Sequence, residues 1–386
     1  MIGGASTYTP ELVDGIGRLG LPVDELALVD PDTDRLEVVA GLGRRILARW
    51  GSPCTVTTTT DVAEASTGAA AVLLQLRVGG QAARERDETW PLSCGCIGQE
   101  TTGAGGLAKA MRTVPVVRRI AERVREVAPD AWIVDFTNPV GIVTRALLDD
   151  GHRAIGLCNV AIGLQRLIAK LLEVEPGAVE LTHVGLNHLS WETGVTVAGE
   201  PVLPRLLRDF GDALVEEVEL PVSLLRREGT IPSYYLRYFY EHDALVRESR
   251  EKGSRAAAVA RIERELLELY ADPELDSKPE LLAQRGGAYY SEAAVALLRS
   301  LLWDTVPGRH VVNVRNAGTL PFLPDEAVIE VSATVGRDGA APCRSARSLP
   351  WPAASSPTRP PTRSSPSTPR ATAAAIASRA PFSPTP

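Results

Sequence analysis

The chain has 386 residues, 44% of them hydrophobic and 23% charged, and a formal net charge of −7. This balance excludes the basic surface of a nucleic-acid-binding protein, and no apolar stretch approaches the roughly 20 residues that a membrane helix needs. Five cysteines in so long a chain argue against a disulfide framework and favour a reducing compartment. We therefore expect a cytoplasmic protein with a small-molecule ligand and with neither a nucleic-acid nor a membrane partner.

The N-terminal residues have the composition of a dinucleotide-binding turn. Gly3 and Gly4 are followed by Ser6 and Thr7, and Pro10 suits the start of a helix. No strand precedes the glycines, and a glycine turn alone is a weak signal. We take Gly3, Gly4, Ser6 and Thr7 as candidate cofactor-binding residues.

A strand predicted over residues 25–29 strengthens this interpretation, because it ends in Asp30, about 25 residues past the glycines. A carboxylate at that place bonds the ribose diol and disfavours a 2′-phosphate, which favours NAD over NADP. The alternative is that Asp30 only caps the turn that follows it at Pro31 and Asp32.

The middle of the chain carries three apolar runs bounded by turn residues. They predict buried strands over residues 131–136, 154–157 and 179–186. Helical spacing of apolar residues over 142–148 and 163–172 fills the gaps, and this alternation predicts a parallel sheet. Ligands gather outside the carboxyl ends of such strands. Four residues with suitable side chains stand there: Asn138, Cys158, Asn159 and His188.

Further elements flank this region. An arginine-rich stretch over 77–88 suits a phosphate or carboxylate, although it is equally typical of a solvated helix face. A glycine-rich segment over 98–106 lacks the ending of a P-loop, and we expect a flexible loop that lines the site. The other predicted strands are 55–59, 70–76, 191–197, 310–314 and 327–331. The other predicted helices are 35–50, 107–128, 202–218, 233–245, 255–270 and 289–303.

Together these elements predict an α/β fold. We expect a Rossmann-like parallel sheet, as in lactate and malate dehydrogenases, and a second α+β, mainly helical domain. An NAD-binding domain with a truncated first strand is placed at residues 1–184, and a substrate, metal and oligomerisation domain at residues 185–341. Residues 342–386 contain no acidic residue and no lysine, a composition that cannot bury a core. We expect a disordered tail there or the product of a shifted reading frame.

Six ordered motifs resemble those of glycoside hydrolase family 4, and within it those of the 6-phospho-beta-glucosidases. The motifs are residues 3–12, 98–101, 137–139, 157–159, 185–188 and 235–238. The resemblance runs from Met1 to about Val335. This family is an NAD-dependent exception to the two-carboxylate glycosidases.

The resemblance implies hydrolysis of 6-phospho-beta-glucosides to glucose 6-phosphate and an alcohol or sugar. In that mechanism NAD+ takes hydride from C3 of the sugar, and a base removes the acidified proton at C2. The C1 substituent is then eliminated, water adds, and NADH returns the hydride. A divalent ion, usually Mn2+, binds the C2 and C3 oxygens as a Lewis acid.

The resemblance also assigns roles to residues. Cys158 and His188 match the metal ligands, although taken alone each would be interpreted as a core residue. Tyr235 matches the base at C2. An ordinary tyrosine pKa of about 10 is too high for that role, so we expect the metal or Arg237 to lower it.

The substrate-binding positions match Arg84, Asn138 and Arg255, and the two arginines suit a 6-phosphate. Asn159 stands where alpha-specific relatives carry Asp. An Asp there could protonate an axial leaving group and Asn cannot, which favours beta-linked substrates. Asn159 is therefore both a catalytic and a substrate-binding candidate.

Two alternatives remain open. One is an NAD-dependent 2-hydroxy acid or sugar dehydrogenase, because the first half of such an enzyme is similar in kind. The other is an inactive truncated copy, because both ends of the chain depart from the family pattern. The resemblance also implies a homodimer or homotetramer.

Overall fold

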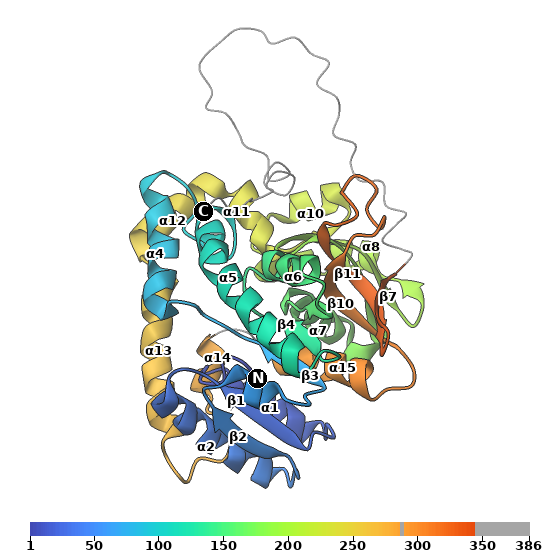
Figure 1. Ribbon diagram of the computed structural model, residues 1–386. Coiled ribbons are helices and arrows are strands. Elements are labelled where there is room, and N and C mark those ends of the chain that lie inside the picture. The colour runs from blue at the N-terminus through green and yellow to red at the C-terminus, as the bar shows by residue number, and fades with distance from the viewer. Residues whose placement is uncertain (286–288, 344–386) are drawn as a thin grey trace. The chain divides into compact units, whose positions relative to one another are not determined.

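The computed structural model describes residues 1–285 and 289–343 (Figure 1). The tail predicted from residue 342 lies outside the described residues from position 344 onward. Its first residue, Pro342, ends strand β12 (Gly339–Pro342), which pairs with β11 (Val328–Gly336).

Two parallel strands begin the fold. β1 (Glu25–Val29) pairs with β2 (Thr55–Thr59), and both have the bounds that the sequence predicts. The residue just before the glycine turn also takes part in the sheet pairing. Ile2 forms parallel bridges to β1 and to β3 (Ala71–Leu74), and so links the β1–β2 pair to the main sheet.

The main sheet has ten strands within the described part of the chain. Their order is β3-β4-β5-β10-β11-β6-β7-β8, with β12 beside β11 and β9 beside β7. The first three are parallel and the others are antiparallel. The remaining bounds are β4 (Trp132–Asp135), β5 (Ala154–Gly156), β6 (Val179–Leu186), β7 (Leu189–Val197), β8 (Glu200–Pro201), β9 (Ile231–Pro232) and β10 (Gly308–Arg315).

The prediction of three neighbouring parallel strands is wrong for the third strand. β10 and β11 lie between β5 and β6, and each pairing along this row is antiparallel. Both intervening strands come from the end of the chain, and no local apolar pattern reveals such a pairing. The pairing nevertheless aligns the ends of β5 and β6. Four successive partners cross the strands: Gly156, Asn313, Glu330 and Gly185.

Helices cover the sheet, and α13 packs against α4 although the two are far apart in sequence (Figure 1). None of the helices in the described residues is long and apolar enough to cross a membrane. Their bounds are α1 (Thr9–Arg18), α2 (Thr33–Arg49), α3 (Val62–Ser66), α4 (Gly80–Ser93), α5 (Gly103–Val127), α6 (Val140–Asp149), α7 (Val160–Leu172), α8 (Leu203–Asp209), α9 (Gly211–Val218), α10 (Val222–Glu228), α11 (Arg237–Tyr240), α12 (His242–Lys252), α13 (Arg255–Tyr270), α14 (Leu281–Arg285) and α15 (Tyr290–Leu302).

The helix predictions are confirmed in part. The helix over 255–270 is α13, whereas the one over 202–218 is broken into α8 and α9. The glycine-rich segment over 98–106 is a loop only as far as Thr102, because α5 begins at Gly103. A Cβ on Gly105 would lie 2.2 Å from the carbonyl oxygen of Asp87, so this glycine permits close packing of α5 against α4 rather than flexibility.

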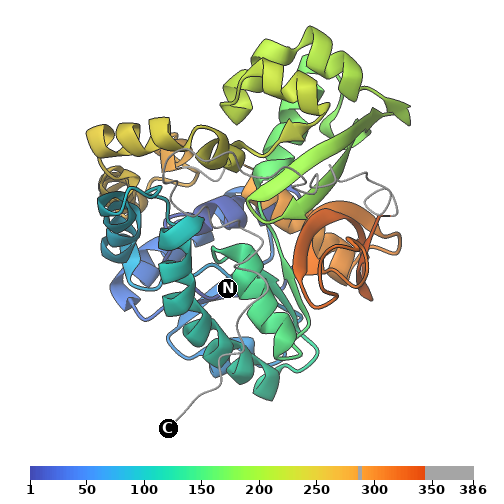
Figure 2. The same ribbon diagram turned by 90° about the horizontal axis from the view of Figure 1, so that it is seen from above.

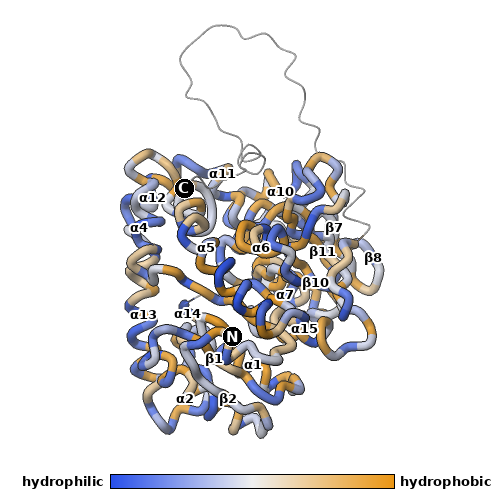
Figure 3. The backbone as a smooth tube through the Cα atoms, in the orientation of Figure 1, coloured by the Kyte–Doolittle hydropathy of each residue, from blue (hydrophilic) through white to orange (hydrophobic). Residues whose placement is uncertain are grey.

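Two buried hydrophobic clusters hold the elements together. The first joins the parallel strands to α5 and α6 around Leu74, Val117 and Leu147. The second packs α7 against the β6–β7 hairpin and α8–α10, around Ile168, Leu206 and Leu225. Figure 2 shows this hairpin and its helices in lime green at one side of the fold, and Figure 3 shows hydrophobic segments gathered where α6, α7 and β10 meet. The predicted domain boundary after residue 184 falls inside β6, and it stays a prediction.

Candidate active site

A cavity of about 1550 Å³ extends from the N-terminal glycine turn to the carboxyl ends of β4 and β5. Typical small-molecule sites are roughly 300–1,000 Å³, so this one has room for more than one ligand. Two of the predicted site residues, Gly4 and Thr7, do not line it. The others all do: Gly3, Ser6, Asp30, Arg84, Asn138, Cys158, Asn159, His188, Tyr235 and Arg255.

The glycine turn packs closely against its neighbours. The N–H groups of Gly3 and Gly4 both donate to the Val29 carbonyl oxygen at 2.9 Å. Gly3 has a φ of +88°, and a Cβ there would lie 2.2 Å from the Gln75 carbonyl oxygen, so only glycine fits. Thr7 is fully buried, and its carbonyl oxygen accepts from the Tyr270 hydroxyl at 2.7 Å. Thr7 therefore anchors the turn to α13 on the side away from the cavity.

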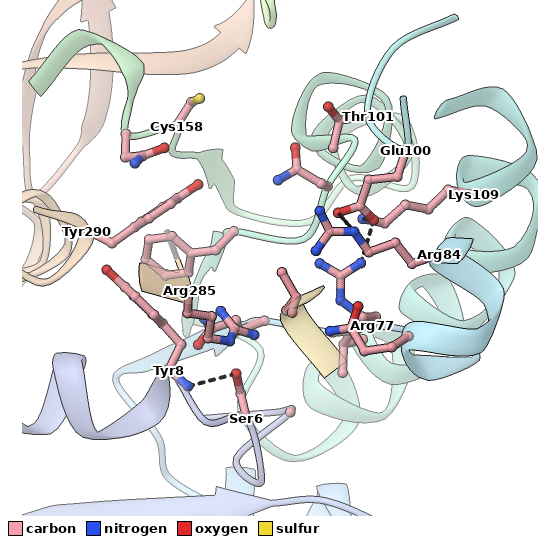
Figure 4. Close-up of a pocket in the computed structure, with 18 of the residues that line it drawn as sticks. Ser6, Tyr8, Arg77, Arg84, Glu100, Thr101, Lys109, Cys158, Arg285 and Tyr290 are labelled. Carbon is pink, nitrogen blue, oxygen red and sulfur yellow. Dashed lines mark hydrogen bonds and ion pairs between the residues drawn. The ribbon is translucent and has the colours of Figure 1, made fainter. Parts of the chain in front are cut away.

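The helix that Pro10 predicts is α1, and Pro10 lies in its first turn. α1 begins at Thr9 after Tyr8, and the Ser6 hydroxyl accepts from the Tyr8 N–H at 3.2 Å (Figure 4). The Thr9 hydroxyl donates back to the Gly4 carbonyl oxygen at 2.9 Å. These bonds fix the turn that faces the cavity.

The turn-capping role considered for Asp30 from sequence is confirmed, and its role at a ribose stays a prediction. Its Oδ1 accepts from the Asp32 N–H at 3.1 Å, which is the turn-capping bond. Its Oδ2 accepts from the Ala5 N–H at 3.3 Å, which ties β1 to the glycine turn. Asp30 also lines the cavity, and burial raises its pKa. A carboxylate held at this place is the arrangement that suits a ribose diol.

Three of the predicted catalytic and metal-binding side chains meet at the far end of the cavity. The Cys158 Sγ lies 3.7 Å from His188 Nε2. The rings of His188 and Tyr235 are stacked, with centroids 3.6 Å apart and planes 12° from parallel. His188 has a φ of +63° in the turn between β6 and β7. Residues from β5, β6 and the segment before α11 therefore form one group.

Burial governs the protonation of this group. It lowers the pKa of His188 to about 4, so the ring is neutral at pH 7. It raises the pKa of the Cys158 thiol, with the Glu330 carboxylate adding to the effect. It also raises the pKa of Tyr235, against a hydrogen bond from the Thr101 side chain.

The expectation that Arg237 lowers the pKa of Tyr235 finds no support in the geometry. The guanidinium of Arg237 lies over the rings of Tyr234 and Tyr238, 4.7 and 5.0 Å from their centroids. It also pairs with the Glu219 carboxylate. The charge of Arg237 is thus directed at other partners.

The donors at Cys158 and His188 fit a divalent metal ion. Two ligands about 2.0–2.3 Å from one ion can stand 3.7 Å apart, and a neutral imidazole is the form that binds metal. The Asn138 Oδ1 is buried without a hydrogen-bond partner beside the same cavity. No group of three His, Cys, Asp or Glu side chains in the described residues is arranged to hold a metal. Cys158 and His188 therefore remain the two predicted ligands for a metal at this site.

Opposite Cys158, the cavity wall carries a cluster of charges that includes the predicted Arg84 and, with it, Glu100 and Lys109, which were not predicted (Figure 4). Glu100 pairs with Arg84 at 3.2 Å, with Lys109 at 2.6 Å and with Arg77. Arg84 also pairs with Glu88 at 2.7 Å. Burial opposes ionisation of Glu100, but Lys109 and the two arginines outweigh it and hold the pKa of Glu100 well below its usual range. Burial lowers the pKa of Lys109 to about 8.

The remaining predicted substrate residues lie nearby. Arg255 is exposed at the first turn of α13, and its Nη2 donates to the Gln284 carbonyl oxygen at 3.3 Å. Asn159 directly precedes α7 beside Cys158. Both line the same cavity as Arg84 and Asn138.

Other lining residues were also not predicted as site residues. Arg285 is paired with Glu263 at 3.2 Å and lies over the Tyr8 ring. Tyr290 packs edge-on against Tyr8 and Phe136. One signal was available for Lys109, because it occupies a position on the buried face of α5 together with Thr113 and Val117. A lysine in a buried stripe indicates a buried charge that needs a partner.

Two family models match this chain. The model described as family 4 glycosyl hydrolase matches residues 1–174, and that of the family's C-terminal domain matches residues 183–355. A probable 6-phospho-beta-glucosidase of Bacillus subtilis is 40% identical over 361 residues, which cover 88% of this chain and 81% of that protein. The 6-phospho-beta-glucosidase of Escherichia coli is 39% identical over 360 residues, covering 88% and 80%.

Solved structures agree. The 6-phospho-beta-glucosidase of Thermotoga maritima with manganese, NAD+ and glucose-6-phosphate aligns with a TM-score of 0.82 at 35% identity, over 89% of this chain and 82% of that one. Malate dehydrogenase of Salinibacter ruber, at 17% identity and a TM-score of 0.53 over 88% and 87%, shares only the fold. The predicted Rossmann-like fold is thereby confirmed. The comparisons do not favour the dehydrogenase alternative, and this chain belongs to glycosyl hydrolase family 4.

Proposed function

We propose that this protein hydrolyses 6-phospho-beta-glucosides to glucose 6-phosphate and an alcohol or sugar, with NAD+ and a divalent metal such as Mn2+. The observation that carries the proposal is the group of Cys158, His188 and Tyr235 in one cavity with the glycine turn and Asp30. Relatives named 6-phospho-beta-glucosidase, at 39–40% identity, support the substrate class.

Different parts of the cavity would hold the two cofactors. Gly3, Ser6 and Asp30 would bind NAD+, and Cys158 and His188 would bind the metal. When bound, these groups supply reversible hydride transfer and stabilisation of negative charge on sugar oxygens.

Tyr235 would take the proton from C2 of the sugar. Its ring is fixed by stacking on His188, which places the phenol beside the metal ligands. Because burial favours the neutral phenol, removal of its proton requires positive charge next to it, and a divalent ion at Cys158 and His188 is the charge that the site offers.

The 6-phosphate and the leaving group of the substrate would bind at opposite sides of the cavity. Arg84 and Arg255 would bind the 6-phosphate and Asn138 a sugar hydroxyl, since guanidinium groups bind phosphate in pairs of hydrogen bonds. Asn159, beside Cys158, carries no acidic proton for an axial leaving group, which supports beta-linked substrates.

The protein would act in the cytoplasm as a homodimer or homotetramer. All five cysteines are free, which is typical of proteins from a reducing compartment. Analytical ultracentrifugation measures the assembly directly.

The function is tested by hydrolysis of p-nitrophenyl beta-glucoside 6-phosphate under reducing conditions, with NAD+ and Mn2+ each present or omitted. We expect release of p-nitrophenol that requires both, without net accumulation of NADH. Stoichiometric NADH would instead indicate a dehydrogenase. No release from a folded chain would indicate an inactive copy.

A further inference from the structure

A buried hydrogen-bonded network lies behind the proposed metal ligands. His183 Nδ1 is 2.6 Å from Glu192 Oε1, and its Nε2 is 3.3 Å from Glu330 Oε2. Asn187 and Asn313 each donate a side-chain N–H to Glu330 Oε1, at 3.2 and 2.9 Å. Glu330 is 2% exposed. None of these five residues is among those that line the cavity.

Asn187 connects this network to both proposed metal ligands. It directly precedes His188 in the β6–β7 turn, where His188 has the left-handed φ of +63°. Its side chain also hydrogen-bonds to Cys158. A carboxamide has two N–H hydrogens, so one can serve the Glu330 carboxylate and the other the Cys158 sulfur.

The first turn of α6 lies close beside Asn187. A Cβ placed on Gly141, in the first turn of α6, would lie only 3.1 Å from the Asn187 Cβ. The register of the sheet adds to this, because Gly156, Asn313, Glu330 and Gly185 are successive partners. The Glu330 carboxylate, which accepts a hydrogen bond from Asn187, therefore has a fixed position relative to the ends of β5 and β6.

We propose that Asn187 is a positioning residue that holds the Cys158 sulfur and the His188 ring in place for a divalent ion, with the Glu330 carboxylate as its anchor. Groups behind metal ligands commonly orient those ligands in this way. The inference rests on the proposed function, because it presupposes the metal site at Cys158 and His188.

The test is metal binding rather than turnover. Mn2+ is titrated into the full-length protein without substrate, and free Mn2+ is measured by electron paramagnetic resonance. N187A should weaken Mn2+ binding about 10- to 100-fold, the usual effect of removing such a supporting group. N313A is the matched control, because it removes the other amide from the same carboxylate oxygen and leaves the Cys158 contact intact. We expect a change of less than about threefold for it.

A second readout reports the sulfur itself. With saturating Co2+, the wild type should show a thiolate-to-cobalt charge-transfer band, and N187A should show a weaker or shifted band while N313A does not. Circular dichroism confirms folding of each variant. Should N187A unfold, N187S replaces it, with the same expected loss because a hydroxyl has one hydrogen and cannot donate to both partners.

The outcomes separate the inference from the proposed function. Wild-type affinity and an unchanged cobalt band in folded N187A would overturn the inference alone. Equal losses in N187A and N313A would also overturn it, because the network would then serve only general stability. Absence of Mn2+ binding in the wild type, or binding that C158S leaves unchanged, would overturn the metal site and the inference with it.

Discussion

At the scale of single residues, Asp30 combines a structural role with a proposed role in binding NAD+. Its carboxylate accepts from the Asp32 and Ala5 N–H groups while it lines the cavity. D30N removes the charge and one of the two acceptor oxygens, so it should weaken NAD+ binding about tenfold and narrow the preference for NAD+ over NADP+, since bonds to a charged acceptor contribute about 1.5–3 kcal/mol. Calorimetric titration of both cofactors measures this. D34N, at an exposed position of α2, should bind like the wild type; equal NAD+ affinity in D30N would contradict the role.

Glu100 is expected to matter for stability as well as for the site. It neutralises three cations, so E100Q leaves buried positive charge and should cost about 3–5 kcal/mol at pH 7. Because folding lowers the pKa of Glu100 from 4.5, its contribution is fully present above pH 4.5 and declines as pH falls below that value. Urea unfolding at pH 7 and at pH 4 measures both effects.

The control for this prediction is E85Q, at an exposed position of α4, the helix that carries Arg84. It should leave the unfolding midpoint unchanged. If E100Q unfolds at the same urea concentration as E85Q at pH 7, the fold does not need Glu100 to neutralise Arg77, Arg84 and Lys109.

Sequence patterns located some site residues and missed others for physical reasons. Cys158, Asn159 and His188 each follow a clear apolar run, so the ends of their strands could be predicted. Glu100 follows no such run, and its importance arises from three cations on other segments. Thr7 has the right residue type for a cofactor turn, but it is fully buried and does not line the cavity.

At the scale of elements, His183 links three strands, because Glu192 is on β7 and Glu330 on β11. Burial alone would lower its pKa, but the two carboxylates raise it from 6.5 to about 10. The stabilisation is therefore complete below pH 6.5 and is lost as pH rises towards 10. H183Q should cost about 3–5 kcal/mol at pH 6, and the difference from wild type should shrink by pH 10.

H310Q provides the matched control for this pH dependence. Burial lowers the pKa of His310 to about 4, so it is neutral in the fold across this range. The change that H310Q makes in the free energy of unfolding should therefore be nearly constant from pH 8 to pH 10. A loss in H183Q that stays constant over the same range would contradict the charged His183.

The elements that could be predicted are those whose pattern is local. β1, β2, β6 and α13 have the predicted bounds, because each is a single apolar run or a regular helical stripe. The direction of β6 could not be predicted, because it depends on β10 and β11, which arrive from more than a hundred residues later.

At the scale of the whole molecule, the site exists only once distant segments have met. The glycine turn, the ends of β4 and β5, the β6–β7 turn and the tyrosines before α11 all line one cavity. The family's ordered motifs taken together therefore predict the site better than any single motif does, since each motif contributes residues to a different part of the cavity lining. The central claim is that these walls support removal of the C2 proton during glycoside hydrolysis.

That claim is tested most directly by running the hydrolysis in D2O with NAD+ and Mn2+ and examining the glucose 6-phosphate formed by NMR. We predict deuterium at C2 of the product in the wild type, and loss of both product and exchange in Y235F. Product that retains its original hydrogen at C2 would contradict the account, because the glycosidic bond would then be broken without deprotonation at that carbon.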